Sequence, residues 1–252
     1  MSIPLTRNEL KDLIQFQRSE KRAEFGYFIA ESEKLVREVI ASGWEIDMFV
    51  TTEAYLRQNS WLPETTKVTE LENLLRITRL QSSPEVLAVV KIPQRDLQTI
   101  VESKKPILVL DGISDPGNLG TIIRTADWFG INSLLLTPGS VDPYNAKVVR
   151  ASMGSLFRSK IVQVETPAII AALQEADYQI IVTDVREGDS KPHSDRSIAL
   201  VLGSESHGVS KPLVEAATSL YHIPGFGQAE SLNVAISGAI ALYDFKVVNH
   251  YF

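Results

Sequence analysis

Residues 111–130 read DGISDPGNLGTIIRTADWFG and follow the apolar run PILVL. The pattern predicts a strand, then a polar loop, and then a helix that begins at Asn118. Within this helix, Arg124 stands in the apolar stretch IIRTA. A charged side chain in this position either pairs with a nearby acid, such as Asp127 or Glu205, or has a role in a reaction.

Two further loops combine glycine with small polar residues, and each follows an apolar run. They are GSESHG (203–208) and IPGFGQAESLN (223–233). Glycine permits close approach of the backbone to a ligand, although each loop alone also fits a simple turn. Ligands of open α/β sheets bind outside the carboxyl ends of the strands, where we expect all three loops to lie. The sequence therefore predicts a binding site at that edge.

The sequence lacks the residues that several common kinds of catalytic or binding site require. The chain has no cysteine, which excludes disulfides, thiolate metal sites and cysteine nucleophiles. A dinucleotide fingerprint would need glycine where Asp115 stands, and no phosphate-binding G-K-[ST] or nucleophile G-x-S-x-G occurs. The four histidines lack the spacing of a metal site: His193, His207, His222 and His250. We therefore expect a site without metal or thiol, built from Asn, Arg, Glu, Ser and main-chain groups.

Strands and helices alternate from residue 106 onward, which predicts a mostly parallel sheet covered on both faces. The expected strands are 106–112, 132–139, 155–164, 178–185 and 198–205, followed by the run 220–226. The expected helices are 118–130, 143–152, 166–177, one opening at Ser210 and a long one from about Ser231. The fold class is therefore α/β.

The chain is expected to divide near residue 95. Residues 1–95 predict a small α/β domain of about four strands, which includes the strands 45–51 and 85–92. The polar stretch 96–105 is the expected linker, and 106–252 is the second domain.

Charge limits how the protein could bind nucleic acid. Residues 1–95 carry 13 basic and 14 acidic side chains and residues 96–252 carry 12 and 17, giving a net charge of −6. RNA binding would need local basic patches, each of which also fits a solvated face. The candidates are Arg18, Lys21 and Arg22 in one segment and Lys147, Arg150, Arg158 and Lys160 in another. No signal peptide or membrane span is visible, so we expect a soluble, cytoplasmic protein.

Four segments together resemble a known enzyme family. DPGNLGTIIRTADWFG, LVLGSESHG and IPGFGQAESLNVAISGAIALYDF resemble the three motifs of the SpoU (TrmH-type) RNA 2′-O-ribose methyltransferases, of the SPOUT superfamily. FIAESEKLVREVIASGWEIDMFVT resembles the N-terminal substrate-binding domain that many members carry. The two resemblances span almost the whole chain.

The resemblance implies a fold and a cofactor that composition and periodicity do not indicate. The C-terminal domain would contain a deep trefoil knot, form a homodimer and bind S-adenosylmethionine largely through main-chain groups. The implied cofactor-binding residues are Gly203, Ser204, Gly208, Ile223, Pro224, Gly225 and Leu232. The substrate would be RNA, with large-subunit ribosomal RNA favoured over transfer RNA.

The resemblance also assigns catalytic roles. Arg124 would stabilise the charge that develops on a ribose 2′-oxygen, because a guanidinium scarcely deprotonates and is a poor base. Asn118 would orient the hydroxyl, while Glu205, Ser231 and Asn233 would shape the pocket. More simply, Asn118 and Ser231 could be helix N-caps.

Two departures from the motifs concern the cofactor. Ser206 follows Glu205 where the family usually has glycine, and Gly225 stands where it usually has methionine. A non-catalytic RNA-binding module of the same fold is therefore one alternative. A nicotinamide-dependent oxidoreductase is another, and Asp115 argues against it.

Overall fold

The structure is a computed structural model that describes residues 2–78, 84–184, 188 and 196–248. Its contacts divide the chain into two compact units. Unit 1 comprises Met1–Gln94 together with Tyr144–Phe157, and unit 2 comprises Arg95–Pro143 with Arg158–Phe252. The segment 144–157 therefore packs with the N-terminal unit, although the sequence on both sides of it belongs to unit 2. Within the described ranges, no helix is both long enough and apolar enough to cross a membrane.

Unit 1 is an α/β unit with a mixed sheet. Its strands are β1 (Ile3–Pro4), β2 (Tyr27–Glu31), β3 (Ile46–Thr51), β4 (Lys67–Val68) and β5 (Val86–Lys91), in the order β1-β4-β3-β5-β2. Its helices are α1 (Arg7–Gln15), α2 (Ser19–Phe25), α3 (Glu33–Ala41), α4 (Glu53–Gln58), α5 (Leu71–Thr78) and α8 (Ala146–Ala151). Strands β3, β4 and β1 pair in parallel, whereas β5 pairs antiparallel with β3 and β2.

An aromatic cluster holds the segment 144–157 within unit 1. The ring of Phe28 on β2 lies 5.1 Å from that of Tyr144 and 6.4 Å from that of Phe157. The indole N–H of Trp44 donates to the carbonyl of Phe157 over 2.9 Å. Because buried aromatic pairs contribute beyond their area, this cluster stabilises the position of α8 against β2.

Unit 2 contains a six-stranded sheet in which every strand pair is parallel. Its strands are β6 (Ile107–Asp111), β7 (Ser133–Leu136), β8 (Lys160–Gln163), β9 (Gln179–Asp184), β10 (Ile198–Gly203) and β11 (Ser219–His222), in the order β11-β9-β10-β6-β7-β8. Its helices are α6 (Leu97–Glu102), α7 (Pro116–Trp128), α9 (Thr166–Glu175), α10 (Lys211–Glu215) and α11 (Val234–Tyr243). The predicted parallel α/β sheet is confirmed.

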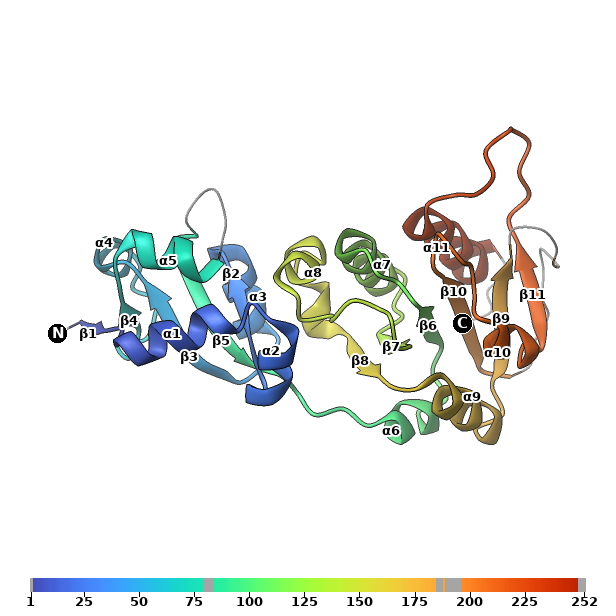
Figure 1. The fold of residues 1–252 in the computed structure, drawn as a ribbon, viewed down its shortest axis with the longest axis horizontal. Helices are drawn as coiled ribbons and strands as arrows, with labels where there is room; N and C mark the ends of the chain where they lie inside the picture. The colour runs from blue at the N-terminus through green and yellow to red at the C-terminus, as the bar shows by residue number, and fades with distance from the viewer. Residues whose placement is uncertain (1, 79–83, 185–187, 189–195, 249–252) are drawn as a thin grey trace. The chain divides into compact units, whose positions relative to one another are not determined.

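Helices cover both faces of this sheet, with α7 and α11 on one side and α6, α9 and α10 on the other (Figure 1). Ile100 and Val101 of α6 are buried in the core of unit 2, so the stretch expected as a linker contributes packing. Helix α11 lies close to the sheet at Gly238, where an added Cβ would stand 2.8 Å from a methyl of Leu202.

Among the expected elements that differ in extent from the structure, three flank or carry predicted site residues. The strand expected over 155–164 is a 3₁₀ turn, η1 (Ser155–Arg158), followed by the short β8. Helix α7 begins at Pro116 rather than Asn118, because proline suits the first helical position. The last helix begins at Val234 rather than near Ser231.

Candidate active site

The site lies where the strand order of unit 2 reverses. Strands β6 and β10 are neighbours, and the chain runs from β6 to β7 and β8 on one side, with β9 and β11 on the other. Such a reversal leaves a crevice at the carboxyl ends of the strands, where ligands of α/β sheets bind. The loops after β6 and β10 begin at this point, as the sequence predicted.

Asp111 fixes these two loops, a role that the sequence analysis missed. Its side chain is buried at the end of β6 and accepts hydrogen bonds from the Thr137 hydroxyl at 2.7 Å and the Ser210 main-chain N–H at 2.6 Å. A buried carboxylate is stabilised by such donors. The signal was present as an aspartate that ends the apolar run ILVLD.

Helix α7 presents Asn118 from its first turn. Asp115 is the N-cap, and its carboxylate accepts the Asn118 main-chain N–H at 2.8 Å. The interpretation of Asn118 as the N-cap is therefore wrong. Because Asp115 performs the capping, the Asn118 side chain is available for other contacts.

Three side chains from the three predicted loops meet in one network. The Asn118 side-chain amide donates to Glu205 Oε1. The Asn233 amide donates to Asn118 Oδ1 at 3.1 Å and to Glu205 Oε1 at 3.2 Å. All three residues are exposed or half-buried, so the network faces solvent. The network therefore joins distant parts of the sequence, because Glu205 is 87 residues and Asn233 is 115 residues from Asn118.

Asn233 also begins the last helix. Its side-chain oxygen accepts the main-chain N–H groups of Ala235 at 3.0 Å and Ile236 at 3.4 Å. The cap of α11 is therefore Asn233, and the interpretation of Ser231 as that cap is wrong. One asparagine thus uses its oxygen to start a helix and its amide to join the network.

The loop after β10 is a tight turn that requires glycine. Ser204 and Gly208 form a bridge with two main-chain hydrogen bonds of 3.1 and 2.9 Å. A Cβ on Gly203 would lie 2.2 Å from the carbonyl carbon of Gly208, which no side chain can tolerate. Gly208 has φ +68°, in the region that favours glycine. The turn holds Glu205 at its outer end.

Arg124 is exposed, and it makes no hydrogen bond or ion pair among the residues that the structure describes. The two acids that could have neutralised it are used elsewhere. Asp127 pairs with Arg158 at 2.9 Å, and Glu205 accepts the two asparagine amides. The guanidinium of Arg124 is therefore available to an external ligand.

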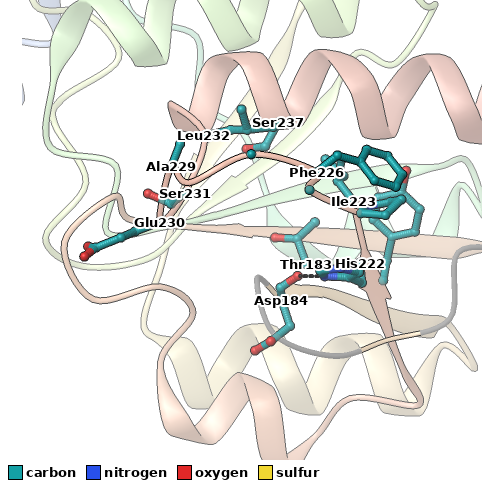
Figure 2. A pocket seen from close by; sticks show the side chains of 14 residues that line it. Thr183, Asp184, His222, Ile223, Phe226, Ala229, Glu230, Ser231, Leu232 and Ser237 are labelled. Atoms are coloured by element: carbon teal, nitrogen blue, oxygen red, sulfur yellow. Dashed lines mark hydrogen bonds between the residues drawn. The ribbon is translucent and has the colours of Figure 1, made fainter.

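A pocket of about 320 Å³ is lined on one side by Ser231 and Leu232, which directly precede Asn233 of the network (Figure 2). Five of the residues singled out from the sequence line it: Ile223, Pro224, Gly225, Ser231 and Leu232. Gly203, Ser204 and Gly208 are not among its lining residues. The lining also includes residues that sequence reasoning missed, namely Thr183, Asp184, Tyr221, His222, Phe226, Gly227, Ala229, Glu230 and Ser237. These lie at the ends of β9 and β11, on the last loop and on α11.

The last loop offers free main-chain groups to this pocket. In the described part of the chain, residues 224–232 form no hydrogen bond. Main-chain N–H and C=O groups that lack partners in an exposed loop can pair with a ligand. The pocket therefore combines such groups with apolar side chains such as Ile223 and Leu232.

The predicted RNA-contacting residues have different surroundings. Arg22 is 4% exposed and donates to the Phe16 carbonyl at 2.7 Å, so its expected place on an exposed basic face is wrong. Three of the other residues in the two patches form ion pairs: Lys21, Arg150 and Arg158. Arg18 and Lys147 are exposed, and Lys160 is half-buried.

Metal ligands do not gather in the described ranges, where no cluster of three His, Asp or Glu side chains could hold a metal ion. His193 and His250 lie outside those ranges.

A parallel α/β sheet with polar loops and a pocket at its carboxyl edge defines a ligand-binding domain of the α/β class. Residues 105–243 match the SpoU rRNA Methylase family, and residues 7–88 match the MRM3-like substrate binding domain. Because the first match covers more than half of the chain, the protein belongs to the SpoU rRNA methylase family. The resemblance drawn from the motifs is confirmed.

Some relatives and solved structures align with this chain over almost its whole length. The 23S rRNA (guanosine(2553)-2′-O)-methyltransferase RlmP of Bacillus subtilis (strain 168) is 30% identical over 242 residues, which cover 94% of this chain and 96% of the relative. The AdoMet-bound rRNA methyltransferase of Sinorhizobium meliloti is 30% identical, with a TM-score of 0.83 and coverage of 96% and 95%. The SpoU methyltransferase AviRb of Streptomyces viridochromogenes, in complex with AdoMet, is 25% identical, with a TM-score of 0.82 and coverage of 95% and 97%.

Proposed function

We propose that the protein transfers the methyl group of S-adenosylmethionine to a ribose 2′-hydroxyl of large-subunit ribosomal RNA in the cytoplasm. The observation that carries this proposal is the network of Asn118, Glu205 and Asn233 next to the pocket residue Leu232. Arg124, on the same helix as Asn118, has no partner among the residues that the structure describes. Names of relatives that modify 23S ribosomal RNA support the ribosomal substrate over transfer RNA.

The pocket fits the proposed cofactor. Its volume of about 320 Å³ lies in the range of small-molecule sites, and its lining mixes apolar surface with main-chain groups that have no partner among the described residues. Ile223 and Leu232 would contact the adenosine, and the main chain around Gly225 would bind its polar edges. Gly203, Ser204 and Gly208 would act by fixing the turn that holds Glu205. When bound, the sulfonium supplies an electrophilic methyl group.

The side chains of α7 and of the polar network would prepare the ribose hydroxyl. As the 2′-hydroxyl loses its proton to water, negative charge would develop on the 2′-oxygen. This oxygen would then form its bond to the methyl carbon while the sulfur–carbon bond breaks and the donor leaves as a neutral thioether. Arg124 would stabilise that charge, since a fixed cation needs no reorganisation at the moment of reaction. Asn118, held by Glu205 and Asn233, would fix the hydroxyl in line with the methyl group. Ser231, on the pocket wall, would help to shape this entry.

Unit 1 is proposed to bind the RNA. Its match to a substrate binding domain supports this role, and the exposed Arg18 and Lys147 are its candidate phosphate contacts. A loop or splayed strand of RNA would suit a methyltransferase, because a 2′-hydroxyl in such a segment is accessible.

A second copy of the chain is the proposed partner of unit 2. Side chains on one stripe of α11 and the following π-helical turn are exposed: Ile236 53%, Ile240 39%, Tyr243 52% and Val247 44%. Trp128, at the end of the adjacent α7, is 85% exposed. An apolar face of this kind is typical of an interface. Ile236→Glu should convert dimers into monomers in analytical ultracentrifugation, and a monomeric wild-type protein would contradict the assignment.

We also infer that the segment after β11 passes through a loop to form the trefoil knot. Its support is the packing of α11 against both α7 and β10, together with the hydrogen bonds from Asn233 to Asn118 and Glu205.

The central test is methyl transfer itself. Tritiated S-adenosylmethionine should label ribose in ribosomal RNA from a strain that lacks the protein, and RNA from the parent strain should accept much less. Mapping ribose methylation in the two strains would identify the nucleotide. Binding of RNA without cofactor binding or labelling would instead favour a non-catalytic RNA-binding module.

A further inference from the structure

Phe226 lies in the last loop with almost its whole side chain in solvent. It is 97% exposed, yet it is one of the residues that line the pocket. Figure 2 shows its ring near Ile223, at the opposite end of the loop from Glu230 and Ser231. A large apolar ring left in water is stabilised when a ligand covers it, so an uncovered ring at the rim of a pocket marks a binding position.

The backbone around Phe226 permits the ring to adjust to a ligand. Glycines flank it, and a Cβ added at Gly225 or Gly227 would meet no atom within 4 Å. The same loop forms no hydrogen bond over 224–232 in the described part of the chain. Because glycine has wide conformational freedom, small changes at these two positions can move the ring across the pocket.

The pocket offers a flat ligand group two kinds of contact at this end. Ile223 and Tyr221 provide apolar surface, and Phe226 would provide an aromatic face opposite them. A planar heteroaromatic ring is the group that such a slot fits, because bases stack on aromatic side chains with little dependence on their identity. The reacting end of a ligand would lie at the other end of the loop, which continues into Asn233 and the polar network.

We propose that Phe226 stacks on the adenine ring of the methyl donor and covers the adenosine end of the pocket. This inference rests on the proposed function, since it names a further binding residue of the same cofactor site. It assigns the ring to binding and not to the methyl-transfer step, because Asn233 of the network follows the other end of the loop, after Ser231 and Leu232.

Calorimetric titration of the purified protein with S-adenosylmethionine, and separately with S-adenosylhomocysteine, tests the proposal. Phe226→Ala should weaken both ligands by about tenfold or more, the loss expected for one stacked base. Phe226→Trp should restore affinity, whereas Phe226→Leu should restore it only in part, because leucine lacks an aromatic face. Phe25→Ala is the matched control, since Phe25 of unit 1 is 41% exposed and does not line the pocket.

Kinetics separate the cofactor from the RNA. Under the proposal, the effect of Phe226→Ala falls on the KM for S-adenosylmethionine, and the KM for ribosomal RNA changes little. Affinity for both cofactor forms equal to wild type would overturn the proposal, and so would a rise confined to the KM for RNA, which would place a substrate base on the ring. If the wild-type protein fails to bind S-adenosylmethionine at all, the proposed function itself fails, whatever the variants do.

Discussion

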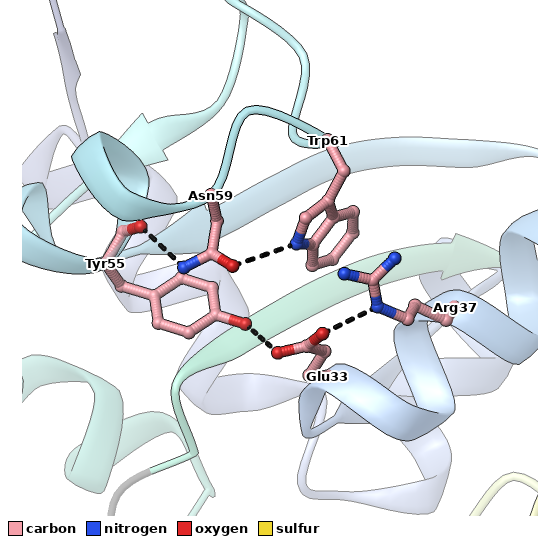
Figure 3. A network of polar contacts seen from close by, with 5 residues as sticks. All are labelled: Glu33, Arg37, Tyr55, Asn59 and Trp61. Atoms are coloured by element: carbon pink, nitrogen blue, oxygen red, sulfur yellow. Dashed lines mark hydrogen bonds and ion pairs between the residues drawn. The ribbon is translucent and has the colours of Figure 1, made fainter.

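Two exposed arginines, one in each unit, have opposite surroundings. Arg37 of α3 donates to Glu33 at 2.6 Å and lies 4.1 Å above the ring of Trp61 (Figure 3). Glu33 in turn accepts the hydroxyl of Tyr55. Arg124 of α7 makes no such contact in the described ranges. An exposed arginine on a helix therefore has a structural role in unit 1, whereas the corresponding residue type in unit 2 remains available to bind a ligand.

The network around Arg37 shows how a surface arginine becomes structural. Hydrogen bonds from Tyr55 and Arg37 hold the pKa of the Glu33 carboxyl below its ordinary value. Burial and the neighbouring Glu33 raise the pKa of the Tyr55 hydroxyl above its ordinary value. The hydrogen bond from Tyr55 to Glu33 ties α4 to α3, and Asn59 accepts the Trp61 indole N–H at 3.2 Å, which helps to hold the ring beside Arg37. The ion pair with Glu33 and the contact with the Trp61 ring therefore give Arg37 a structural role in unit 1.

The sharpest test of this contrast is Arg124→Ala. Loss of a single charge-stabilising donor costs about a hundredfold to a thousandfold in kcat. Because Arg124 is exposed and has no partner in the described ranges, the free energy of unfolding should change by less than about 0.5 kcal/mol. Single-turnover methyl transfer and urea denaturation measure the two effects.

Arg196→Ala is the control for Arg124→Ala. Arg196 is an exposed arginine of unit 2 that pairs with Asp177 at 3.0 Å, and its loss should leave methyl transfer within about twofold. Equal activity of the two variants would remove Arg124 from the proposed mechanism.

Asn233→Ala should weaken both folding and catalysis, because this residue serves both. Loss of the cap of α11 is expected to cost about 1 kcal/mol, which lowers Tm by about 3 °C in a unit of this size. Loss of the amide should also release Asn118 and reduce kcat. Ser231→Ala, two residues earlier, should leave Tm unchanged, since Ser231 caps no helix. A larger Tm loss at Ser231 would contradict this division of roles.

Arg37→Ala should affect the stability of unit 1 and leave catalysis almost unchanged, the reverse of what we expect for Arg124→Ala. Removal of an exposed ion pair and a cation–π contact should lower the Tm of unit 1 by about 2 °C or less. The kcat at saturating RNA should stay within about twofold, because Arg37 belongs to the structural network. A hundredfold loss of kcat would erase the contrast with Arg124.

A third arginine, Arg150, pairs with the buried Glu31 and gives a pH-dependent test. Burial raises the pKa of Glu31 despite the opposing effect of Arg150, and within the described part of the chain Oε1 of Glu31 has no hydrogen-bond partner. Since the folded state favours the protonated form, this contribution to stability is full below the ordinary carboxyl pKa of about 4.3 and is lost as pH rises through the raised pKa.

Glu31→Gln should remove this pH dependence, because the neutral glutamine side chain resembles the protonated glutamate at every pH. The variant and the wild type should differ least at pH 4, and the variant should gain relative stability as the pH rises to 7. Urea unfolding at several pH values measures the difference, and parallel curves for the two proteins would contradict the raised pKa.

The predictable part of the molecule followed from local patterns. Continuous apolar runs such as ILVL predicted the parallel strands, and the rule for strand ends placed the three loops at one edge. That reasoning, with the resemblance, selected Asn118, Glu205 and Asn233, which the structure brings into one network.

The remaining features depend on competition and packing that a linear pattern does not encode. Asp115, and not Asn118, is the N-cap of α7, because Pro116 occupies the first helical position. Likewise Asn233, and not Ser231, is the N-cap of α11. Arg22 looked like a surface charge, yet its guanidinium satisfies the Phe16 carbonyl in the core of unit 1. The pocket residues Thr183 and Asp184 end a strand that carries no motif.

The hydrogen bonds from Asn233 span 115 residues to Asn118 and therefore have a consequence for protein synthesis. While a ribosome is still translating the stretch before position 233, the emerging polypeptide can form β6 and α7 but lacks the amide that completes the site. A chain that terminates before residue 233 therefore lacks Asn233, and we expect such a fragment to be inactive in RNA methylation.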